Sequence, residues 1–195
     1  MHWTVHKFGG TSLADAACFR RVADIVLSQP AGNRAVVVSA VGGVTDHLLG
    51  LIERASAQQP VHDAIAALRE RYRALGAELL TPEAGAAFLE QFETELGDID
   101  SVLKALSLVK AASHRSRDMV SGFGELWSAR LLSALLQERE GVDQAVVCLD
   151  ARDVLVVQAG EMGPIVRWEV TRSKLAGAIT DRFEGIVVIT GYIAR

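Results

Sequence analysis

The sequence has 195 residues, half of them hydrophobic, and a formal net charge of −4. That length suits one large domain with a sizeable hydrophobic core. A mildly acidic chain without a polybasic cluster gives no support to a nucleic-acid surface or to an anionic membrane surface, so we expect neither partner.

Cysteine usage and the start of the chain bear on the compartment. Cys18 and Cys148 are far apart in the sequence, which favours two reduced thiols over a disulfide framework. The first residues do not have the pattern of a signal peptide, and no apolar run approaches membrane-spanning length. We therefore expect a cytoplasmic protein.

The N-terminal part alternates predicted strands with predicted helices. Residues 3–8 alternate in polarity, which indicates a strand, and residues 13–28 have a helical period. Ser12 and Asp15 stand in the positions of a capping box for that helix. Residues 34–41, RAVVVSAV, form a β-branched run that is typical of a strand buried on both faces. The next helix is expected to begin in the sequence GGVTD that follows.

Residues 60–140 are almost entirely helical in pattern and form an insertion between core strands. The sequence TPE at residues 81–83 is typical of a helix start. Gly97 indicates a kink or a division of that segment. A further helix is expected over residues 114–140, with Gly141 as its C-cap.

The C-terminal part returns to strands. QAVVCLD (residues 144–150) and GIVVIT (residues 185–190) are predicted as buried strands. Residues 153–157 and 164–168 indicate short exposed strands, and residues 170–183 a helix. Together these elements predict an α/β fold, with a mostly parallel sheet flanked by helices and a long helical insertion.

A glycine turn follows the first predicted strand in the sequence VHKFGGTS. Lys7 lies near the end of the strand, and Gly9, Gly10, Thr11 and Ser12 follow it. Backbone N–H groups of such a turn, a helix N-terminus and a lysine together can bind an anion. The pattern is neither a P-loop nor a dinucleotide-binding fingerprint. A tight turn with a solvated lysine remains an equal alternative on this evidence.

A second glycine turn, SAVGGVTD at residues 39–46, follows the second strand. Because ligands in open α/β sheets bind beyond the carboxyl ends of the strands, the two turns could face one crevice. The alternative is that Thr45 or Asp46 merely caps the following helix.

A third segment, SGFGE, interrupts a helical pattern with Gly122 and Gly124, each of which costs about 1 kcal/mol relative to alanine. The glycines could let a ligand approach, with Glu125 accepting from an ammonium group; the alternative is close helix packing beside an exposed glutamate. The five histidines lack metal-ligand spacing, so we expect no metal held by the protein. RERYR (residues 69–73) is interpreted as a charged helix face.

The three segments KFGGTS, VVVSAVGGVTDHL and RDMVSGFGE, in this order and spacing, resemble the aspartokinases of the amino-acid kinase superfamily. The resemblance extends over the whole chain, and LDARDVL and GIVVITGYIAR also look like segments of that family. It implies the family's activity: ATP-dependent phosphorylation of the L-aspartate side-chain carboxylate to 4-phospho-L-aspartate, with Mg²⁺ carried by ATP. This is the committed step towards lysine, threonine and methionine.

The resemblance also implies roles for individual residues. Lys7 would neutralise charge on the transferring phosphoryl group, and Glu125 would meet the ammonium of aspartate. Phosphate oxygens would be held by Gly9, Gly10, Thr11 and Ser12. Aspartate would be bound by Ser39, Thr45 and Glu125. Two departures from the family are Asp46, where asparagine is usual, and Gly122, where serine is common.

The resemblance further implies that residues 1–195 are the amino-acid-binding N-terminal lobe, that the nucleotide-binding half is absent from them, and that they are inactive alone. The sequence resembles aspartokinases fused to homoserine dehydrogenase or diaminopimelate decarboxylase at least as closely as it resembles free-standing aspartokinases. Of these two fusion partners, we slightly favour the decarboxylase. The full-length protein is expected to be a homo-oligomer. Alternatives are a non-catalytic amino-acid-binding or regulatory module and an acetylglutamate kinase-like enzyme.

Overall fold

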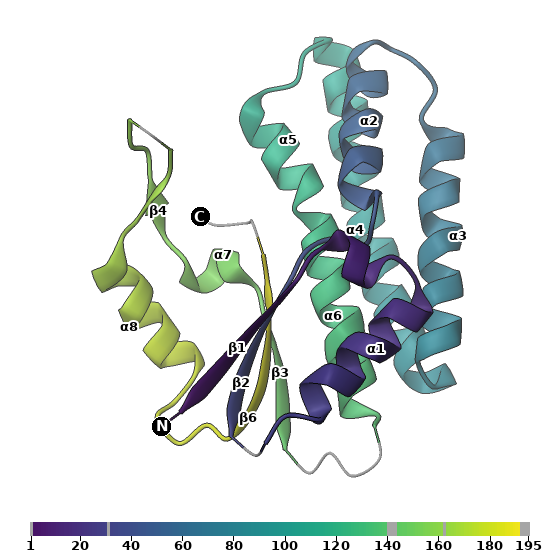
Figure 1. Ribbon diagram of the computed structural model, residues 1–195. Coiled ribbons are helices and arrows are strands. Elements are labelled where there is room, and N and C mark those ends of the chain that lie inside the picture. The colour runs from purple at the N-terminus through teal and green to yellow at the C-terminus, as the bar shows by residue number, and fades with distance from the viewer. Residues whose placement is uncertain (1, 31, 140–143, 162, 192–195) are drawn as a thin grey trace.

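The structure, a computed structural model, describes residues 2–30, 32–139, 144–161 and 163–191. Its centre is a four-stranded sheet in which every neighbouring pair is parallel, with the order β1-β2-β6-β3 (Figure 1). The strands are β1 (Trp3–Phe8), β2 (Asn33–Val38), β3 (Ala145–Leu149) and β6 (Gly185–Thr190). The predicted parallel α/β sheet is therefore confirmed, with the two most buried strands, β2 and β6, at its centre.

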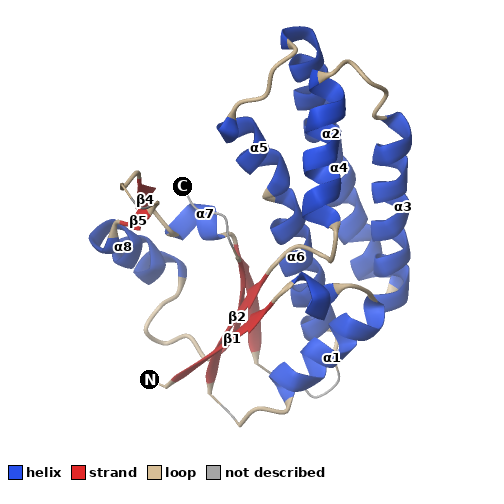
Figure 2. Ribbon diagram, turned by 45° about the horizontal axis from the view of Figure 1, so that its top comes forward, coloured by secondary structure: helices blue, strands red, loops and turns tan. Residues whose placement is uncertain are grey.

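Most helices lie on one side of this sheet and form a tall bundle (Figures 1 and 2). They are the 3₁₀ helix η1 (Gly10–Leu13) and α1 (Ala16–Leu27), α2 (Val44–Ser56), α3 (His62–Leu79), α4 (Pro82–Val109), α5 (His114–Ser121) and α6 (Phe123–Gln137). The other side carries the short helix α7 (Ala151–Val154), α8 (Trp168–Ala178) and an antiparallel pair, β4 (Val157–Gln158) and β5 (Ile165–Val166).

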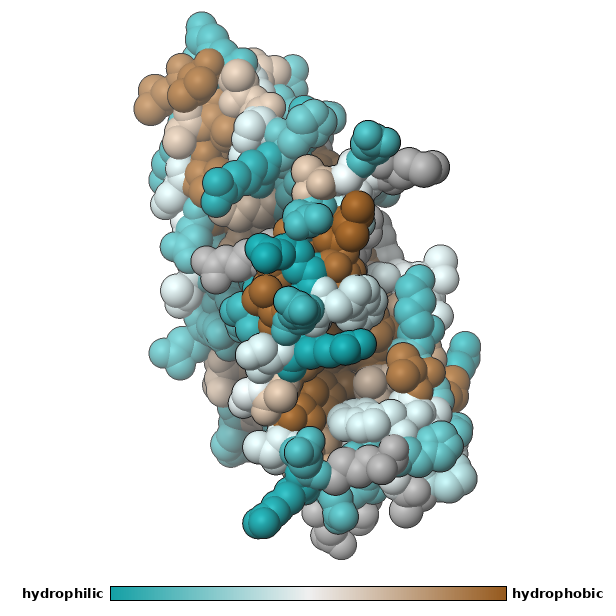
Figure 3. Space-filling view, turned by 90° about the vertical axis from the view of Figure 1, so that its left-hand side faces the viewer, coloured by the Kyte–Doolittle hydropathy of each residue, from teal (hydrophilic) through white to brown (hydrophobic). Residues whose placement is uncertain are grey.

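Side-chain alternation along β6 shows how the sheet divides two cores. Ile186 and Val188 point into the main core with the bundle, whereas Val187 and Ile189 pack in a smaller cluster with Leu149 and residues of the α8 side. The second face is covered less completely, since Val5 on β1 is 67% exposed. Apolar surface is visible between polar side chains near the centre of the molecule when it is viewed from the α8 side (Figure 3).

The helical insertion is joined to the rest of the bundle by aromatic packing. Tyr72 of α3, Phe92 of α4 and Trp127 of α6 are fully or almost fully buried. The ring centroid of Phe92 lies 4.7 Å from that of Trp127, and the centroid of Tyr72 lies 5.1 Å from Trp127. These edge-on contacts fix α3 and α4 against α6.

The first predicted helix begins later than expected. Ser12 lies within η1, and Asp15 is the N-cap of α1, where its carboxylate accepts a hydrogen bond of 2.8 Å from the Cys18 N–H. The charge on this carboxylate is favoured at a helix N-terminus, and the same hydrogen bond lowers the pKa of Asp15. The capping role assigned to Ser12 was therefore wrong.

Two expectations within the insertion also need correction. The segment with Gly97 is one unbroken helix, α4, which begins at Pro82 behind the predicted cap Thr81. The helix expected over residues 114–140 is instead divided at Gly122 into α5 and α6. Gly97 is exposed and has no neighbour that requires a bend, whereas Gly122 is buried at the junction of two helices. The predicted C-cap Gly141 lies outside the described residues.

The C-terminal segments differ from expectation in detail. Residues 151–154, expected partly as strand, form helix α7, because the Asp150 carboxylate caps it at the Arg152 N–H and Val154 is buried in the smaller cluster. The exposed strands are confirmed only as the two-residue pair β4 and β5, and α8 ends at Ala178. Among the helices described, none is both long and apolar enough to cross a membrane.

Candidate active site

The two glycine turns meet at the carboxyl edge of the sheet. We call residues 9–12 the first glycine loop and residues 39–43 the second. Phe8 pairs with Val38 in the sheet, and the Ser39 N–H donates to the Phe8 carbonyl at 3.0 Å, so both loops leave the sheet side by side. A Cβ on Gly10 would lie 3.1 Å from the Ala40 oxygen, and a Cβ on Gly42 would lie 3.1 Å from the Gly10 oxygen. Glycine at both positions therefore permits direct contact between the backbones of the loops.

The second loop ends in a left-handed glycine. Gly43 has a φ of +79° and is the N-cap of α2, with no side-chain cap. The Val44 N–H donates to the Val41 carbonyl at 2.9 Å, which closes the turn through backbone groups alone. Thr45 and Asp46 are consequently not needed as caps, and both line the cavity described below.

Helix α6 brings Glu125 to the same place by a very close approach. A Cβ on Gly124 would lie only 2.8 Å from the Cβ of Ala40 and 3.3 Å from Cγ1 of Val44, so a larger residue would push the helix away from the second loop. Glu125 itself is only 5% exposed. The alternative of an exposed glutamate beside packing glycines is therefore excluded.

Burial sets the electrostatic character of Glu125. Loss of water raises the pKa of its carboxyl, while interactions with the backbone N–H groups of Glu125 and Ala40 act in the opposite direction. Among the described residues no lysine, arginine or histidine forms an ion pair with it. A cationic ligand group would therefore find a largely desolvated carboxylate whose charge the protein does not neutralise by an ion pair.

These elements enclose a cavity of about 470 Å³, a volume that suits a small molecule. Of the predicted site residues it is lined by Lys7, Gly10, Ser39, Thr45 and Glu125. Gly9, Thr11 and Ser12 are not among the lining residues, and Thr11 and Ser12 are exposed. Within the described part of the chain, no hydrogen bond or ion pair engages the Lys7 ammonium. The cavity thus presents a cation, a buried carboxylate and two glycine loops to one space.

Seven further lining residues were not singled out as ligands from the sequence: Val37, Ala40, Val41, Gly42, Gly43, Asp46 and Gly191. Gly191 follows β6, whose place between β2 and β3 could be found only from the assembled sheet. Its N–H donates to the Val38 carbonyl at 2.8 Å, which ties this third strand end to the second loop. The carboxyl-end rule for parallel sheets was the signal that could have indicated this position.

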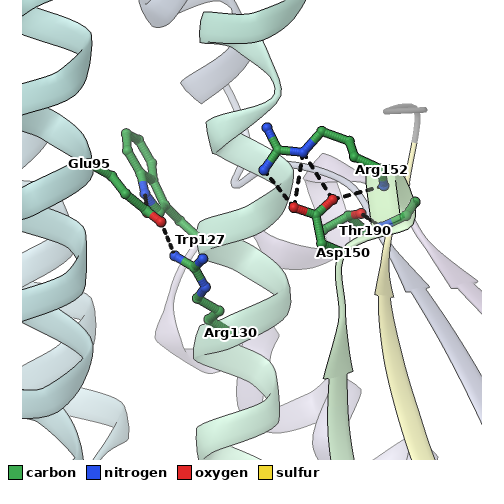
Figure 4. Close-up of polar contacts among 7 residues, drawn as sticks. Glu95, Trp127, Arg130, Asp150, Arg152 and Thr190 are labelled. Carbon is green, nitrogen blue, oxygen red and sulfur yellow. Dashed lines mark hydrogen bonds and ion pairs between the residues drawn. The ribbon is translucent and has the colours of Figure 1, made fainter. Parts of the chain in front are cut away.

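Two polar networks lie on either side of helix α6, which carries the cavity residue Glu125 (Figure 4). On one side the carboxylate of Glu95 accepts from Trp127 Nε1 at 2.8 Å and from Arg130. On the other side Asp150 pairs with Arg152 through two guanidinium nitrogens, and this pairing raises the pKa of Arg152. Both arginines are already satisfied by carboxylates, so the networks support the position of α6 and β3 rather than offer a free anion site.

No group of three or more metal-binding side chains occurs in the ranges that the structure describes. Cys18 and Cys148 are free thiols. Burial raises the pKa of the Cys148 thiol, which disfavours the nucleophilic thiolate form. What the site offers chemically is electrostatic: it can orient a small zwitterion and stabilise negative charge near Lys7.

Comparison with known proteins identifies the family of the chain. The sequence profile of the amino acid kinase family matches residues 2–195. Bifunctional aspartokinase/homoserine dehydrogenase 1 of Arabidopsis thaliana is 32% identical, with 98% of this chain and 21% of that protein covered. Bifunctional aspartokinase/homoserine dehydrogenase 2 of Escherichia coli is 31% identical, with 98% and 23% covered.

The fold has a counterpart among solved structures. E. coli aspartokinase III in complex with aspartate and ADP superimposes with a TM-score of 0.82 at 29% identity, covering 99% of this chain and 41% of that one. The chain thus spans between 21% and 41% of the length of these three proteins. With the family profile extending over nearly all of its residues and the fold matching, the chain belongs to the amino acid kinase family.

Proposed function

We propose that residues 1–195 form the amino-acid-binding part of an aspartate kinase, which transfers the γ-phosphoryl group of Mg²⁺-ATP to the side-chain carboxylate of L-aspartate. The observation that carries the proposal is that Lys7 and the buried Glu125 line one cavity between two glycine loops. The relatives are aspartokinases, and one of the similar structures holds aspartate and ADP, which supports this substrate and this nucleotide.

Glu125 supplies the site for the ammonium of aspartate. Its carboxylate is desolvated, and an ammonium ion restores favourable charge pairing to it. Ser39 and Thr45, which also line the cavity, supply hydroxyl groups for the carboxylates. This arrangement selects a ligand that carries one cation and anionic oxygens within a few bonds of each other.

Lys7 acts on the phosphoryl group. An oxygen of the aspartate side-chain carboxylate attacks the γ-phosphorus, the bond from that phosphorus to the oxygen bridging to the β-phosphate breaks, and ADP leaves with the electron pair. The attacking carboxylate is already ionised at neutral pH, so no general base is required. Phosphoryl transfer then depends mainly on positioning and on charge stabilisation, which the Lys7 ammonium and the N–H groups of the glycine loops supply.

The physiological context follows from the same proposal. The product, 4-phospho-L-aspartate, is an acyl phosphate and opens the route to lysine, threonine and methionine. Free cysteines at positions 18 and 148 support a reducing compartment, which we take to be the cytoplasm. The full-length protein is proposed to act as a homo-oligomer.

Calorimetry with two ligands tests the proposal. Succinate has both carboxylates of aspartate but no ammonium, so the protein should bind aspartate much more tightly than succinate. Glu125→Gln removes the charge at nearly constant shape and should reduce aspartate affinity about ten- to a hundredfold while changing succinate affinity little. Equal affinities for the two ligands, or equal loss of both in Glu125→Gln, would refute the assigned ammonium site.

A further inference from the structure

Helix α3 supports the cavity from behind, although none of its residues lines it. Its sequence RERYR places arginines at positions 69, 71 and 73. Arg69 and Arg73 are four residues apart, so they share one helix face, and both pair with Glu93 of α4 at 2.9 and 3.1 Å. Arg71 lies between them in the sequence and projects from a different face.

Arg71 contacts the two segments that form the cavity. Its Nη2 atom donates to the Gly42 carbonyl at 2.8 Å and to the Ala14 carbonyl at 3.2 Å. Gly42 belongs to the second glycine loop, and Ala14 follows the first loop and η1. One guanidinium nitrogen is therefore hydrogen-bonded to both of the segments that meet at the Gly10–Gly42 backbone contact. The interpretation of residues 69–73 as merely a charged face was wrong.

The Arg71 contact also fixes the direction of a peptide group. In a planar trans peptide the carbonyl and the N–H of the next residue point in opposite directions. Since the Gly42 carbonyl points to Arg71, the Gly43 N–H points away from α3. Gly43 lines the cavity, and no acceptor for its N–H occurs among the described residues.

We propose that Arg71 is a positioning residue of the cavity: its guanidinium holds the peptide between Gly42 and Gly43 so that the Gly43 N–H can donate to an anionic oxygen of the bound substrate. Glycine on both sides would otherwise leave the peptide between Gly42 and Gly43 free to rotate. The charged guanidinium of Arg71 favours the one orientation in which the Gly42 carbonyl accepts its hydrogen bond. Arg71 itself need not touch the substrate. The anionic oxygen rests on the proposed function, whereas the peptide orientation does not.

The test uses three variants of the full-length protein. Arg71→Ala removes the clamp, Arg73→Ala is a matched control on the same helix, and Arg71→Met, which keeps much of the side-chain length without a donor, replaces Arg71→Ala if the latter melts well below the control. Hydrogen–deuterium exchange is first measured without ligand in the peptide that contains the second glycine loop. We expect faster exchange in this loop for the Arg71 variant alone, with the strands unchanged.

Aspartate binding is then measured by calorimetry. Arg71→Ala should bind aspartate about tenfold more weakly than Arg73→Ala, as expected for loss of charged hydrogen bonds that order a ligand-binding group. Guanidinium ion at a concentration far below denaturing levels should restore binding to Arg71→Ala and not affect the control, with sodium chloride at equal ionic strength as reference. A purely structural role would not be rescued.

The outcomes separate this inference from the proposed function. If the two alanine variants have the same exchange in the second loop, the inference is overturned whatever the protein binds. If loop exchange differs but the unaltered protein binds no aspartate, the positioning role stands and the proposed substrate is wrong. If aspartate binds and Arg71→Ala matches Arg73→Ala in affinity, the link from peptide orientation to substrate binding fails.

Discussion

Replacing Gly124 by alanine should displace Glu125 from the cavity. The new Cβ would lie 2.8 Å from the Ala40 Cβ, roughly 1 Å short of ordinary carbon–carbon contact. Neither atom can rotate away, because each Cβ is fixed directly to the backbone, so α6 has to move relative to the second loop. Overpacking of this kind costs about 1–3 kcal/mol, which opposes a helix-propensity gain of at most about 1 kcal/mol.

The matched control is Gly97→Ala in α4, where the glycine is exposed and a Cβ would meet nothing within 4 Å. The control should gain stability of about 1 kcal/mol and melt roughly 2–4 °C higher. Gly124→Ala should melt no higher than the unaltered protein and bind aspartate about tenfold more weakly, since Glu125 is the adjacent residue. Scanning calorimetry and aspartate titration measure both effects. Equal stabilisation by the two substitutions with unchanged affinity would refute the close-approach argument.

Three further predictions concern charge, loop contact and capping. Burial raises the pKa of Glu125, so the folded state keeps the proton on this carboxyl to higher pH than the unfolded chain does. The free energy of unfolding should therefore fall as the pH rises above 4.5 and level off beyond the pKa of the folded state. Urea titrations of Glu125→Gln should lack this slope, and an identical slope in both proteins would contradict it. Gly42→Ala should separate the glycine loops and weaken aspartate binding with little change in melting temperature; unchanged affinity would contradict the contact with Gly10. Thr81→Ala should cost about 1 kcal/mol in urea unfolding, because the Thr81 hydroxyl oxygen accepts from the Ala84 N–H at the start of α4, and no measurable loss would contradict this capping role.

Much of the fold could be predicted because the strands that form the sheet carry unambiguous patterns. The β-branched run of β6 is buried on both faces, and that of β2 is buried on the bundle side and half-buried on the other. Their parallel pairing follows from the helices between them. Helix boundaries were less certain where two good caps compete. Ser12 and Asp15 are both acceptable N-caps, and only the tight turn of η1 decides for Asp15. Likewise the apolar run at residues 153–157 is split between α7 and β4 because Val154 is drawn into the smaller core cluster.

The sequence was sufficient to predict that the two glycine loops meet at one cavity. It was not sufficient to predict the contact by which Arg71 holds the second loop. The carboxyl-end rule placed the loops after β1 and β2 together, which is where Lys7 and Ser39 lie. No local pattern could place Arg71, because an arginine in a charged helix faces solvent or a neighbour according to what packs against the helix. That depends on the position of α3 relative to the glycine loops, which is a property of the assembled fold.

Steady-state kinetics of two alanine variants of the full-length protein test most directly whether Lys7 acts on the phosphoryl group and Glu125 on the bound aspartate. Lys7→Ala should lower kcat about a hundred- to a thousandfold with little change in aspartate affinity, because the charge it stabilises develops during phosphoryl transfer. Glu125→Ala should chiefly raise the aspartate KM, because its partner is present in the ground state. Exchanged phenotypes, or full turnover in Lys7→Ala, would contradict the account.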